Sequence, residues 1–223
     1  MVKLYSIEGN IGSGKTTFIK FLTEYSSNKK NLIILPEPLA LWENIVNSDG
    51  DNVLTSLYKN QERNALNFQI IALFTRRKLL VETMENALNL EKQLGEEVII
   101  LSERTLKSDY HIFATMLHNQ KKLSDHDFTA YKFLYNEYSE EFKLSKAIYI
   151  KTSPEICHQR VDVRSRNGED HISLSYLKDC DKAHEDFYNV YLSTIDCKII
   201  NNDHNFHDDT YEQQIKEIIE YLF

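Results

Sequence analysis

Five short apolar runs recur along the chain, at residues 4–7, 32–35, 98–101, 147–150 and 197–200. Each run is nearly uniformly apolar and is followed by polar residues, as in strands of a parallel sheet buried on both faces. Long segments poor in glycine and proline separate the runs, and two of them, 62–93 and 125–144, have apolar residues at helical spacing. The pattern predicts an α/β fold: a five-stranded parallel sheet wrapped by helices, with ligands at the carboxyl ends of the strands.

Composition narrows the class of protein. The 223 residues suffice for a sizeable core and contain no linker or repeat, so we predict one domain over residues 1–223. The formal net charge of −8 argues against nonspecific nucleic-acid binding, which needs a basic face, but is compatible with a nucleotide ligand. No apolar run approaches the roughly 18 residues of a membrane span, and the early first strand leaves no room for a signal peptide.

The cysteines indicate a reducing compartment. Cys157, Cys180 and Cys197 lack metal-ligand spacing, and an odd number makes a poor disulfide framework, so we predict free thiols. We therefore expect a cytoplasmic protein with neither nucleic acid nor membrane as a partner.

The octapeptide at residues 9–16 follows the first apolar run and fits the phosphate-binding P-loop pattern G-x-x-x-x-G-K-S/T. Its glycines let backbone N–H groups point at phosphate oxygens, and the helix that follows adds partial positive charge. We expect Lys15 to reach the terminal phosphates and the Thr16 hydroxyl to hold Mg²⁺. A chance match in a Gly-rich turn is the alternative, which the strand-to-helix context disfavours. The residues predicted to bind the donor here are Gly9, Asn10, Ile11, Gly12, Ser13, Gly14, Lys15, Thr16 and Thr17.

Charged residues also follow the second and third runs. Two prolines fix the backbone around Glu37, whose carboxylate could take a proton from an attacking hydroxyl; a surface Glu in a stiff loop is the alternative. Glu103 could bind Mg²⁺, and Arg104 could fix Glu37 and neutralise charge, although a surface ion pair fits as well. Trp42, the only tryptophan, could stack on a base or fill the core.

Three arginines follow the fourth run, at Arg160, Arg164 and Arg166. The first two share a helix face with no acidic partner at helical spacing, so they would repel each other unless an anion lies between them. The helix is expected to break at Gly168, as a mobile lid would. A solvated basic helix end is the alternative.

Together these motifs resemble the deoxyribonucleoside kinases, in particular the deoxycytidine/deoxyguanosine/deoxyadenosine kinases. Residues 7–11, Pro36-Glu37-Pro38 with Trp42, Phe68-Gln69, Glu103-Arg104 and residues 164–166 occur in that family's order and spacing. The resemblance runs from about residue 2 to 191, and more weakly to the C-terminal helix. It implies a P-loop kinase fold with an Arg-rich lid. It also implies that ATP and Mg²⁺ are used to phosphorylate the 5′-hydroxyl of a deoxynucleoside in nucleotide salvage.

The resemblance also implies a homodimer built through the helices at 62–93 and 125–144. Their periodicity alone is equally compatible with ordinary core packing.

The resemblance implies a role for individual residues. Glu37 would be the base for the 5′-hydroxyl and Glu103 would help hold Mg²⁺, although the carboxylate of the Glu-Arg pair is the alternative base. Arg104 would lie near the 5′-hydroxyl and the transferred phosphoryl group. Tyr58 and Glu169 would grip the 3′-hydroxyl. Gln69 would pair with the base edge, in a slot lined by Leu39, Trp42, Leu54, Leu57, Phe68 and Phe113. The donor phosphates would be clamped by Lys15, Arg160, Arg164 and Arg166.

Substrate choice can be predicted from Ala72, Arg76 and Asp109, which match a small residue, an Arg and an Asp in members that use deoxycytidine or purines. A buried Asp109 paired with Arg76 would accept a hydrogen bond from an exocyclic amino group. Thymine would present a carbonyl oxygen instead, at a cost of about 1.5–3 kcal/mol. We expect deoxycytidine or a purine deoxynucleoside to be preferred over thymidine. A salt bridge between helices, outside the slot, is the alternative.

Two rival functions share the P-loop. A nucleoside monophosphate kinase, such as a thymidylate kinase, would need extra positive charge near Glu37, and residues 39–42 offer none. A nucleotide-sensing module would not need Glu37, Arg104 and Gln69 together.

Overall fold

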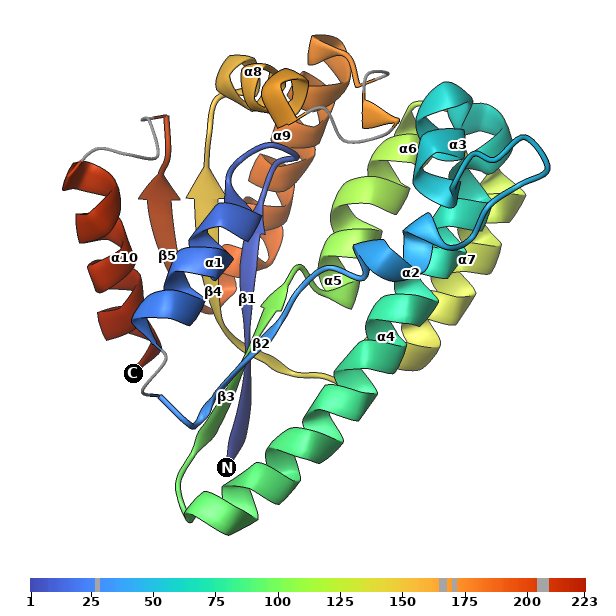
Figure 1. Ribbon diagram of the computed structural model, residues 1–223. Helices are drawn as coiled ribbons and strands as arrows, with labels where there is room; N and C mark the ends of the chain where they lie inside the picture. Colours follow the sequence, from blue (N-terminus) through green and yellow to red (C-terminus); the bar gives the residue numbers. More distant parts are fainter. Residues whose placement is uncertain (27–28, 165–167, 170–171, 204–208) are drawn as a thin grey trace.

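The strands form one parallel sheet at the centre of the molecule (Figure 1). The computed structural model describes residues 1–26, 29–164, 168–169, 172–203 and 209–223. Within them the sheet has five strands in the order β2-β3-β1-β4-β5, and every neighbouring pair is parallel. This confirms the fold predicted from the apolar runs. The strands are β1 (Val2–Gly9), β2 (Leu32–Leu35), β3 (Val98–Glu103), β4 (Leu144–Lys151) and β5 (Asp196–Asn201).

Helices cover both faces of the sheet (Figure 1). Those of the first half of the chain are α1 (Lys15–Tyr25), α2 (Leu39–Glu43), α3 (Val53–Lys59), α4 (Gln61–Leu94) and α5 (Leu106–Ser108). A π-helical segment η1 (Asp109–Ala114) leads into α6 (Thr115–Asn119). The remaining helices are α7 (Asp125–Tyr138), α8 (Pro154–Arg164), α9 (Leu174–Val190), the 3-10 turn η3 (Leu192–Thr194) and α10 (Asp209–Leu222).

Two hydrophobic layers explain why the strand sequences are apolar throughout. In β3, Val98 and Ile100 pack toward α4 and α7, whereas Ile99 and Leu101 pack toward α1 and α10. Successive side chains of a strand point to opposite faces, so a strand with helices on both sides needs an apolar residue at every position.

The two long helices begin at capping residues. Asn60 precedes α4 and its side chain accepts a hydrogen bond from the N–H of Arg63, while Gly95 ends the helix with φ 72°. Ser124 and Asp127 form a reciprocal capping box at the start of α7. These side chains satisfy N–H groups that a helix end would otherwise leave without partners.

The predicted helix at residues 125–144 was too long. The helix α7 ends at Tyr138, and Leu144 is already the first residue of β4, where it pairs with Leu4 of β1. The buried Phe142 and Leu144 contributed to the helical spacing of the pattern, but Phe142 lies in the connection and Leu144 in the strand. Apolar spacing over a few residues cannot separate a helix end from a strand start.

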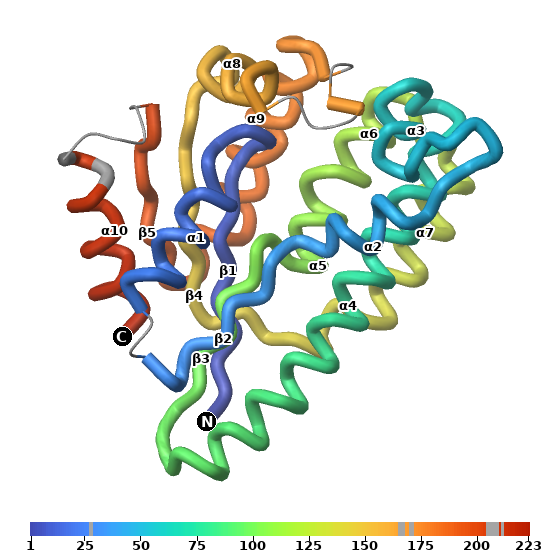
Figure 2. The backbone as a smooth tube through the Cα atoms, viewed as in Figure 1, coloured from blue at the N-terminus to red at the C-terminus, as the bar shows by residue number. Residues whose placement is uncertain are grey.

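The carboxyl ends of the strands come together at one edge of the sheet. The register aligns Leu35 of β2 with Ser102 of β3, and Ile7 of β1 with Glu103. The P-loop, Glu37 and the Glu103-Arg104 pair therefore lie at the same edge. Figure 2 shows that α4 starts beside this edge and runs back past the opposite one, so its first half stands next to the strand ends. Among the described residues, no helix combines the length and the hydrophobicity that crossing a membrane requires.

Two buried tyrosines give a matched test of this packing. Tyr131 is fully buried, and its hydroxyl has no hydrogen-bond partner among the described residues. Tyr149 is buried too, but its hydroxyl donates to Oε1 of Glu185 at 2.8 Å. An unsatisfied buried hydroxyl is costly, so Tyr131→Phe should raise the free energy of unfolding by about 1 kcal/mol. Tyr149→Phe should lower it by about 1–2 kcal/mol.

Urea unfolding of the two variants and the parent measures both effects. If Tyr131→Phe lost as much stability as Tyr149→Phe, the Tyr131 hydroxyl would have a partner and the packing described for α7 would be wrong.

Candidate active site

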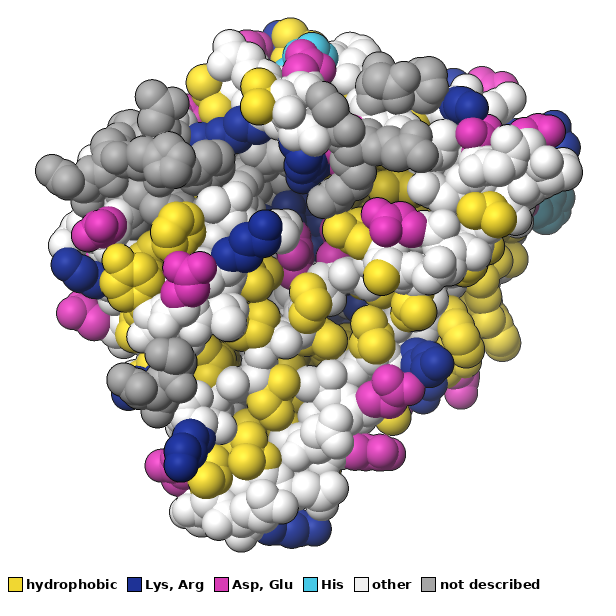
Figure 3. All heavy atoms as spheres, viewed as in Figure 1, with side chains coloured by type: hydrophobic (Ala, Val, Ile, Leu, Met, Phe, Trp, Pro, Cys, Tyr) yellow, Lys and Arg dark blue, Asp and Glu magenta, His cyan; other side chains and the backbone are white. Residues whose placement is uncertain are grey.

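A cavity of about 700 Å³ lies at the carboxyl edge of the sheet. The space-filling view shows acidic and basic side chains inside a hollow near the centre of this face (Figure 3). The cavity is bounded by the P-loop, the strand ends, α2 to α4, η1, α8 and α9. Most of the residues predicted for the site line it. They are Ile11, Gly12, Gly14, Lys15, Thr16, Thr17, Glu37, Leu39, Trp42, Leu54, Leu57, Tyr58, Phe68, Gln69, Ala72, Arg76, Glu103, Arg104, Asp109, Phe113, Arg160, Arg164 and Glu169.

A few predicted residues do not line the cavity. The side chains of Asn10 and Ser13 are buried beneath the P-loop, where Asn10 donates to the carbonyl of Leu177 at 2.9 Å. Gly9 packs against β4: a Cβ on it would lie 2.5 Å from the carbonyl oxygen of Ile150. These three residues pack on the side of the P-loop that faces away from the cavity and so support its conformation. Arg166 lies outside the described residues.

The P-loop holds Lys15 in place through its own backbone. Nζ of Lys15 donates to the carbonyls of Gly9 at 3.1 Å and Asn10 at 2.9 Å. Burial, with the nearby charge of Arg104, lowers the pKa of Lys15 to about 8. Thr16 lies beside the tip of β3, with its hydroxyl 3.2 Å from Oε1 and 3.4 Å from Oε2 of Glu103.

One arginine joins the strand ends to η1. Arg76 of α4 is buried, and its Nε donates to Oδ2 of Asp109 at 2.8 Å. Its other nitrogens donate to the backbone carbonyl of Glu103 at 2.8 Å and to Oε1 of Glu37 at 3.2 Å. Arg104 approaches the same Glu37 oxygen with its Nε at 3.5 Å. Arg76 and Asp109 thus form a buried pair, and both residues line the cavity.

The two carboxylates of the site have opposite pKa shifts. Burial by itself would raise the pKa of Glu37, but the charges of Arg104, Arg76 and Lys15 outweigh it and hold that pKa below its usual value. The pKa of Glu103 is raised by burial and by the negative charge of Glu37. Glu37 is therefore the carboxylate that stays ionised, and Glu103 is the one that gains from a cation beside it.

The apolar end of the cavity contains a polar atom without a partner. Gln69 is buried, and its Oε1 has no hydrogen-bond partner among the described residues. Trp42 and Phe68 pack edge to face with ring centroids 5.1 Å apart, and Nε1 of Trp42 donates to Oγ1 of Thr75 at 3.0 Å. Trp42 thus both fills the core and lines the cavity. A buried amide oxygen without a partner is costly and indicates a place where a ligand donates.

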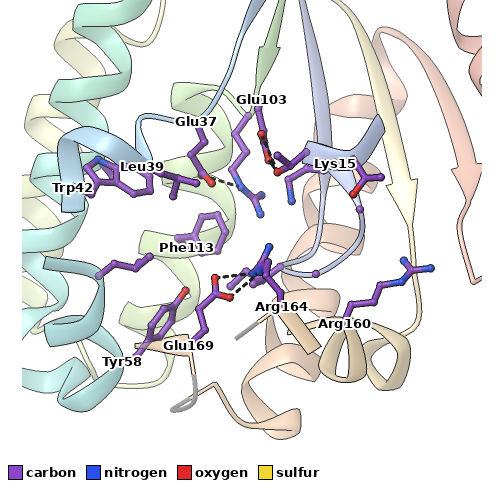
Figure 4. Close-up of a pocket in the computed structure, with 18 of the residues that line it drawn as sticks. Lys15, Glu37, Leu39, Trp42, Tyr58, Glu103, Phe113, Arg160, Arg164 and Glu169 are labelled. Atoms are coloured by element: carbon purple, nitrogen blue, oxygen red, sulfur yellow. Dashed lines mark hydrogen bonds and ion pairs between the residues drawn. The ribbon is translucent and has the colours of Figure 1, made fainter. Parts of the chain in front are cut away.

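The side of the cavity facing α8 differs from the prediction (Figure 4). The sequence offers Arg164 no acidic partner at helical spacing, but the side chain donates to both oxygens of Glu169, five positions on, at 2.9 and 2.6 Å. Gly168, with φ 86°, precedes Glu169, which meets the end of α8. Helical spacing could not reveal this pair. Arg160 donates to the carbonyls of Asn202 at 2.9 Å and Ser13 at 3.4 Å.

Three further buried groups support the site without having been predicted. Glu8 of β1 is fully buried and both its carboxylate oxygens lie 2.8 Å from the hydroxyl of Ser108, just before Asp109. His184 of α9 contacts Arg104. A carboxylate inside a strand buried on both faces was a signal for Glu8; no local pattern identified His184.

Comparison with known proteins decides the family. The model of the deoxynucleoside kinase family matches residues 5–222. The chain belongs to the deoxynucleoside kinase family. The probable deoxycytidine kinase of fowlpox virus (strain NVSL) is 34% identical over 220 residues, covering 95% of this chain and 83% of the relative. Human deoxycytidine kinase is 28% identical over 245 aligned positions, covering 99% and 91%. The mitochondrial deoxyguanosine kinase of Xenopus laevis is 31% identical over 198 positions, covering 82% and 72%.

Family membership confirms the predicted P-loop kinase fold and the broad activity. The protein is a deoxynucleoside kinase, a transferase that uses a nucleotide and acts on small-molecule nucleosides.

Gly168 offers a test of how the kinase places Glu169 in the cavity. Its φ of 86° is strained for other residues, and an added Cβ would clash with Thr55, whose Cα would be 2.9 Å away. Gly168→Ala should push Glu169 out of the cavity and raise the KM for the nucleoside about tenfold or more.

Gly50 is the matched control, because its φ is 82° and a Cβ there would meet nothing within 4 Å. Steady-state kinetics on both variants separate the clash from the backbone strain. Equal KM values for Gly168→Ala and Gly50→Ala would show that the contact with Thr55 does not position Glu169.

Proposed function

We propose that this kinase transfers the γ-phosphate of ATP to the 5′-hydroxyl of deoxycytidine or a purine deoxynucleoside, in preference to thymidine, as a step of nucleotide salvage. The observation that carries the proposal is the buried Arg76–Asp109 pair, which lines the same cavity as the unpartnered Oε1 of Gln69.

The polar groups of the slot favour a base with an exocyclic amino group. Gln69 offers an acceptor and a donor on one amide, which suits two adjacent atoms of a base edge. Arg76 engages Oδ2 of Asp109, and we assign Oδ1 to the amino group of the base. Burial raises the pKa of Asp109, and the charge of Arg76 counteracts this rise and favours the carboxylate. A thymine carbonyl would then face an acceptor, which disfavours thymidine. Leu39, Leu54, Leu57, Ala72 and Phe113 would supply the apolar walls.

The opposite end of the cavity suits a triphosphate. The P-loop N–H groups, Lys15, Arg160 and Arg164 would bind the donor phosphates, and Arg166 is assigned with them by position in the sequence. Lys15 now donates to two carbonyls of its own loop, so its ammonium is already aimed along the loop. We assign the lid to the segment from Arg160 to Glu169, because Arg160, Arg164 and Glu169 line the cavity.

The residues near Thr16 fit Mg²⁺. The Thr16 hydroxyl and the Glu103 carboxylate are both hard oxygen ligands within hydrogen-bond distance of each other. Mg²⁺ is commonly bound through one or two protein oxygens and substrate phosphates, which agrees with the absence, among the described residues, of any cluster of three metal-ligating side chains. When bound, the ion would neutralise phosphate charge. Burial raises the pKa of Glu103 and the negative charge of Glu37 adds to the rise, and a cation beside Glu103 would counteract both.

Glu37 is the better candidate for the proton acceptor. Arg104 and Arg76 hold it ionised and fix the position of its Oε1. It would orient the 5′-hydroxyl for in-line attack and accept the proton as the new P–O bond forms, while Lys15 and Arg104 balance the charge on the transferred group. Tyr58 and Glu169, on the far wall of the cavity, would bind the 3′-hydroxyl, and Tyr58 would crowd a 2′-hydroxyl.

Glu37→Gln keeps the size of the side chain and removes its charge. Nucleoside KM should change little, whereas kcat should fall by about 10²–10⁴. Glu103→Gln is the informative comparison. The fall in activity of this variant should be partly reversed by a higher Mg²⁺ concentration. If Glu37→Gln retained full kcat, the proton would have to go to another group.

The substrate preference is tested with Mg-ATP and each of deoxycytidine, deoxyadenosine, deoxyguanosine and thymidine in separate assays. At least one of the first three should have a kcat/KM about tenfold to a hundredfold above that of thymidine. Thymidine turned over as efficiently as the best of the others would refute the role given to Asp109. Turnover of nucleoside monophosphates alone would favour a monophosphate kinase.

We further propose a cytoplasmic homodimer that pairs through α4 and α7. Phe74 and Phe133 on these helices are 58% and 74% exposed, an unusual position for two large aromatic side chains. The three free cysteines agree with a reducing compartment. Sedimentation equilibrium should give twice the chain mass, and Phe133→Glu should shift the protein toward the monomer. A monomer for the parent protein would contradict the proposal.

A further inference from the structure

His184 lies behind the site, where it touches Arg104 without lining the cavity. It is 1% exposed and comes from the middle of α9. Its ring stacks parallel to Tyr149, with centroids 6.4 Å apart, and meets the edge of Phe113 at 6.1 Å. Two aromatic rings therefore pack near the imidazole.

The two ring nitrogens have partners of opposite kind. Nδ1 lies 2.7 Å from the backbone carbonyl of Cys180, which can only accept, so Nδ1 carries the proton. Nε2 lies 3.1 Å from Nη1 of Arg104, which can only donate, so Nε2 accepts. One hydrogen bond fixes the tautomer that the other requires.

Protonation of Nε2 is disfavoured by its surroundings. A second proton would face the guanidinium of Arg104 and lie in the field of Lys15. The carbonyl of Gly9 is also near the ring and favours the protonated form, but burial and the charge of Arg104 outweigh it. Burial and the charge of Arg104 accordingly lower the pKa of His184 well below its usual value.

Arg104 needs such a support. Its backbone has φ 67°, a left-handed conformation that residues other than glycine rarely adopt and that persists only where the surroundings enforce it. Its side chain is buried, and its guanidinium lies 4.7 Å from the centre of the Phe113 ring and 3.5 Å from Oε1 of Glu37. The Glu37 contact is long for a hydrogen bond, so it does not by itself fix the orientation of the guanidinium.

We propose that His184 is a positioning residue, a neutral hydrogen-bond acceptor that orients Arg104 toward Glu37 and the transferred phosphoryl group. This inference rests on the proposed function, because that function assigns Arg104 a role in the phosphoryl transfer. His184 acts only through Arg104 and has no contact with substrate.

Two substitutions of His184 each keep one of its two hydrogen bonds and remove the other. Gln reaches the position of Nε2 and can offer its amide oxygen to Arg104, while it loses the bond to Cys180. Asn reaches the position of Nδ1 and can donate to Cys180, while Arg104 loses its acceptor. Both remove the packing against Tyr149 and Phe113, so both should lower the thermal midpoint to a similar degree.

The experiment compares the parent, His184→Gln, His184→Asn, Arg104→Met and the double variant His184→Asn/Arg104→Met. Each is assayed with Mg-ATP and the deoxynucleoside that the parent uses fastest. The inference predicts that His184→Asn loses kcat about 10-fold to 100-fold with nucleoside KM within about threefold of the parent. His184→Gln should keep kcat within about threefold. The double variant should be no slower than Arg104→Met, because the histidine acts through the arginine.

The outcomes separate this inference from the proposed function. If the parent phosphorylates no deoxynucleoside, the proposed function fails and the inference fails with it. If the parent is active and Arg104→Met keeps full kcat, the proposed activity stands and the inference fails, because Arg104 then has no role in the transfer. If Arg104→Met is impaired but His184→Asn and His184→Gln lose kcat equally, or neither loses any, the proposed function stands and His184 has only a packing role.

A measurement on the folded parent keeps the test open should His184→Asn fail to fold. Nitrogen-15 NMR of histidine-labelled protein should show His184 protonated at Nδ1 and unprotonated at Nε2, with the signal assigned by its loss in His184→Gln. In Arg104→Met the Nε2 resonance should move, because its donor is gone. An unchanged resonance, or a protonated Nε2 in the parent, would overturn the inference.

Discussion

The guanidinium of Arg76 is the interaction on which the site depends. Buried in α4, it binds Asp109 of η1, Glu37 after β2 and the backbone at the end of β3. A buried cation is stable only when such partners replace the water that it has lost. Burial alone would lower the pKa of Arg76, but Asp109 and Glu37 outweigh it and raise that pKa above its usual value. Three segments far apart in the sequence thus bind one guanidinium, and this single planar group sets the position of Asp109 relative to Glu37.

The main parts of the fold followed from the order of apolar runs. Every run became a strand because helices cover both faces of the sheet, and β2 has the predicted bounds. The end of α7 could not be predicted, since Phe142 and Leu144 continue a helical spacing while belonging to a connection and a strand. The spacing of apolar residues indicates which residues are buried. A helix and the strand that follows it can together continue one helical spacing.

The site was predictable where a strand end delivers a residue to the cavity. Glu103 ends β3 and Arg104 follows it, Glu37 lies two residues after β2, and Lys15 lies at the end of the loop after β1, so parallel topology brings them together. The pairing of Arg164 with Glu169 depends on a turn at Gly168, and the contact of His184 with Arg104 depends on how α9 packs against η1. Such contacts are tertiary, and no spacing along the chain encodes them. The family resemblance supplied Glu169 as a site residue, but not its partner.

The bidentate pair between Arg164 and Glu169 makes the two halves of the cavity depend on each other. Two of the three guanidinium nitrogens of Arg164, Nε and Nη2, donate to the Glu169 carboxylate, which lies beside Tyr58. A guanidinium that turns toward an anion gives up this carboxylate, and a carboxylate that turns toward a sugar releases the guanidinium. If Arg164 binds a donor phosphate and Glu169 a sugar hydroxyl, as proposed above, each ligand would change the free energy with which the other is bound, and by linkage the two effects would be equal. Donor and acceptor would then be effectors of one another through this ion pair.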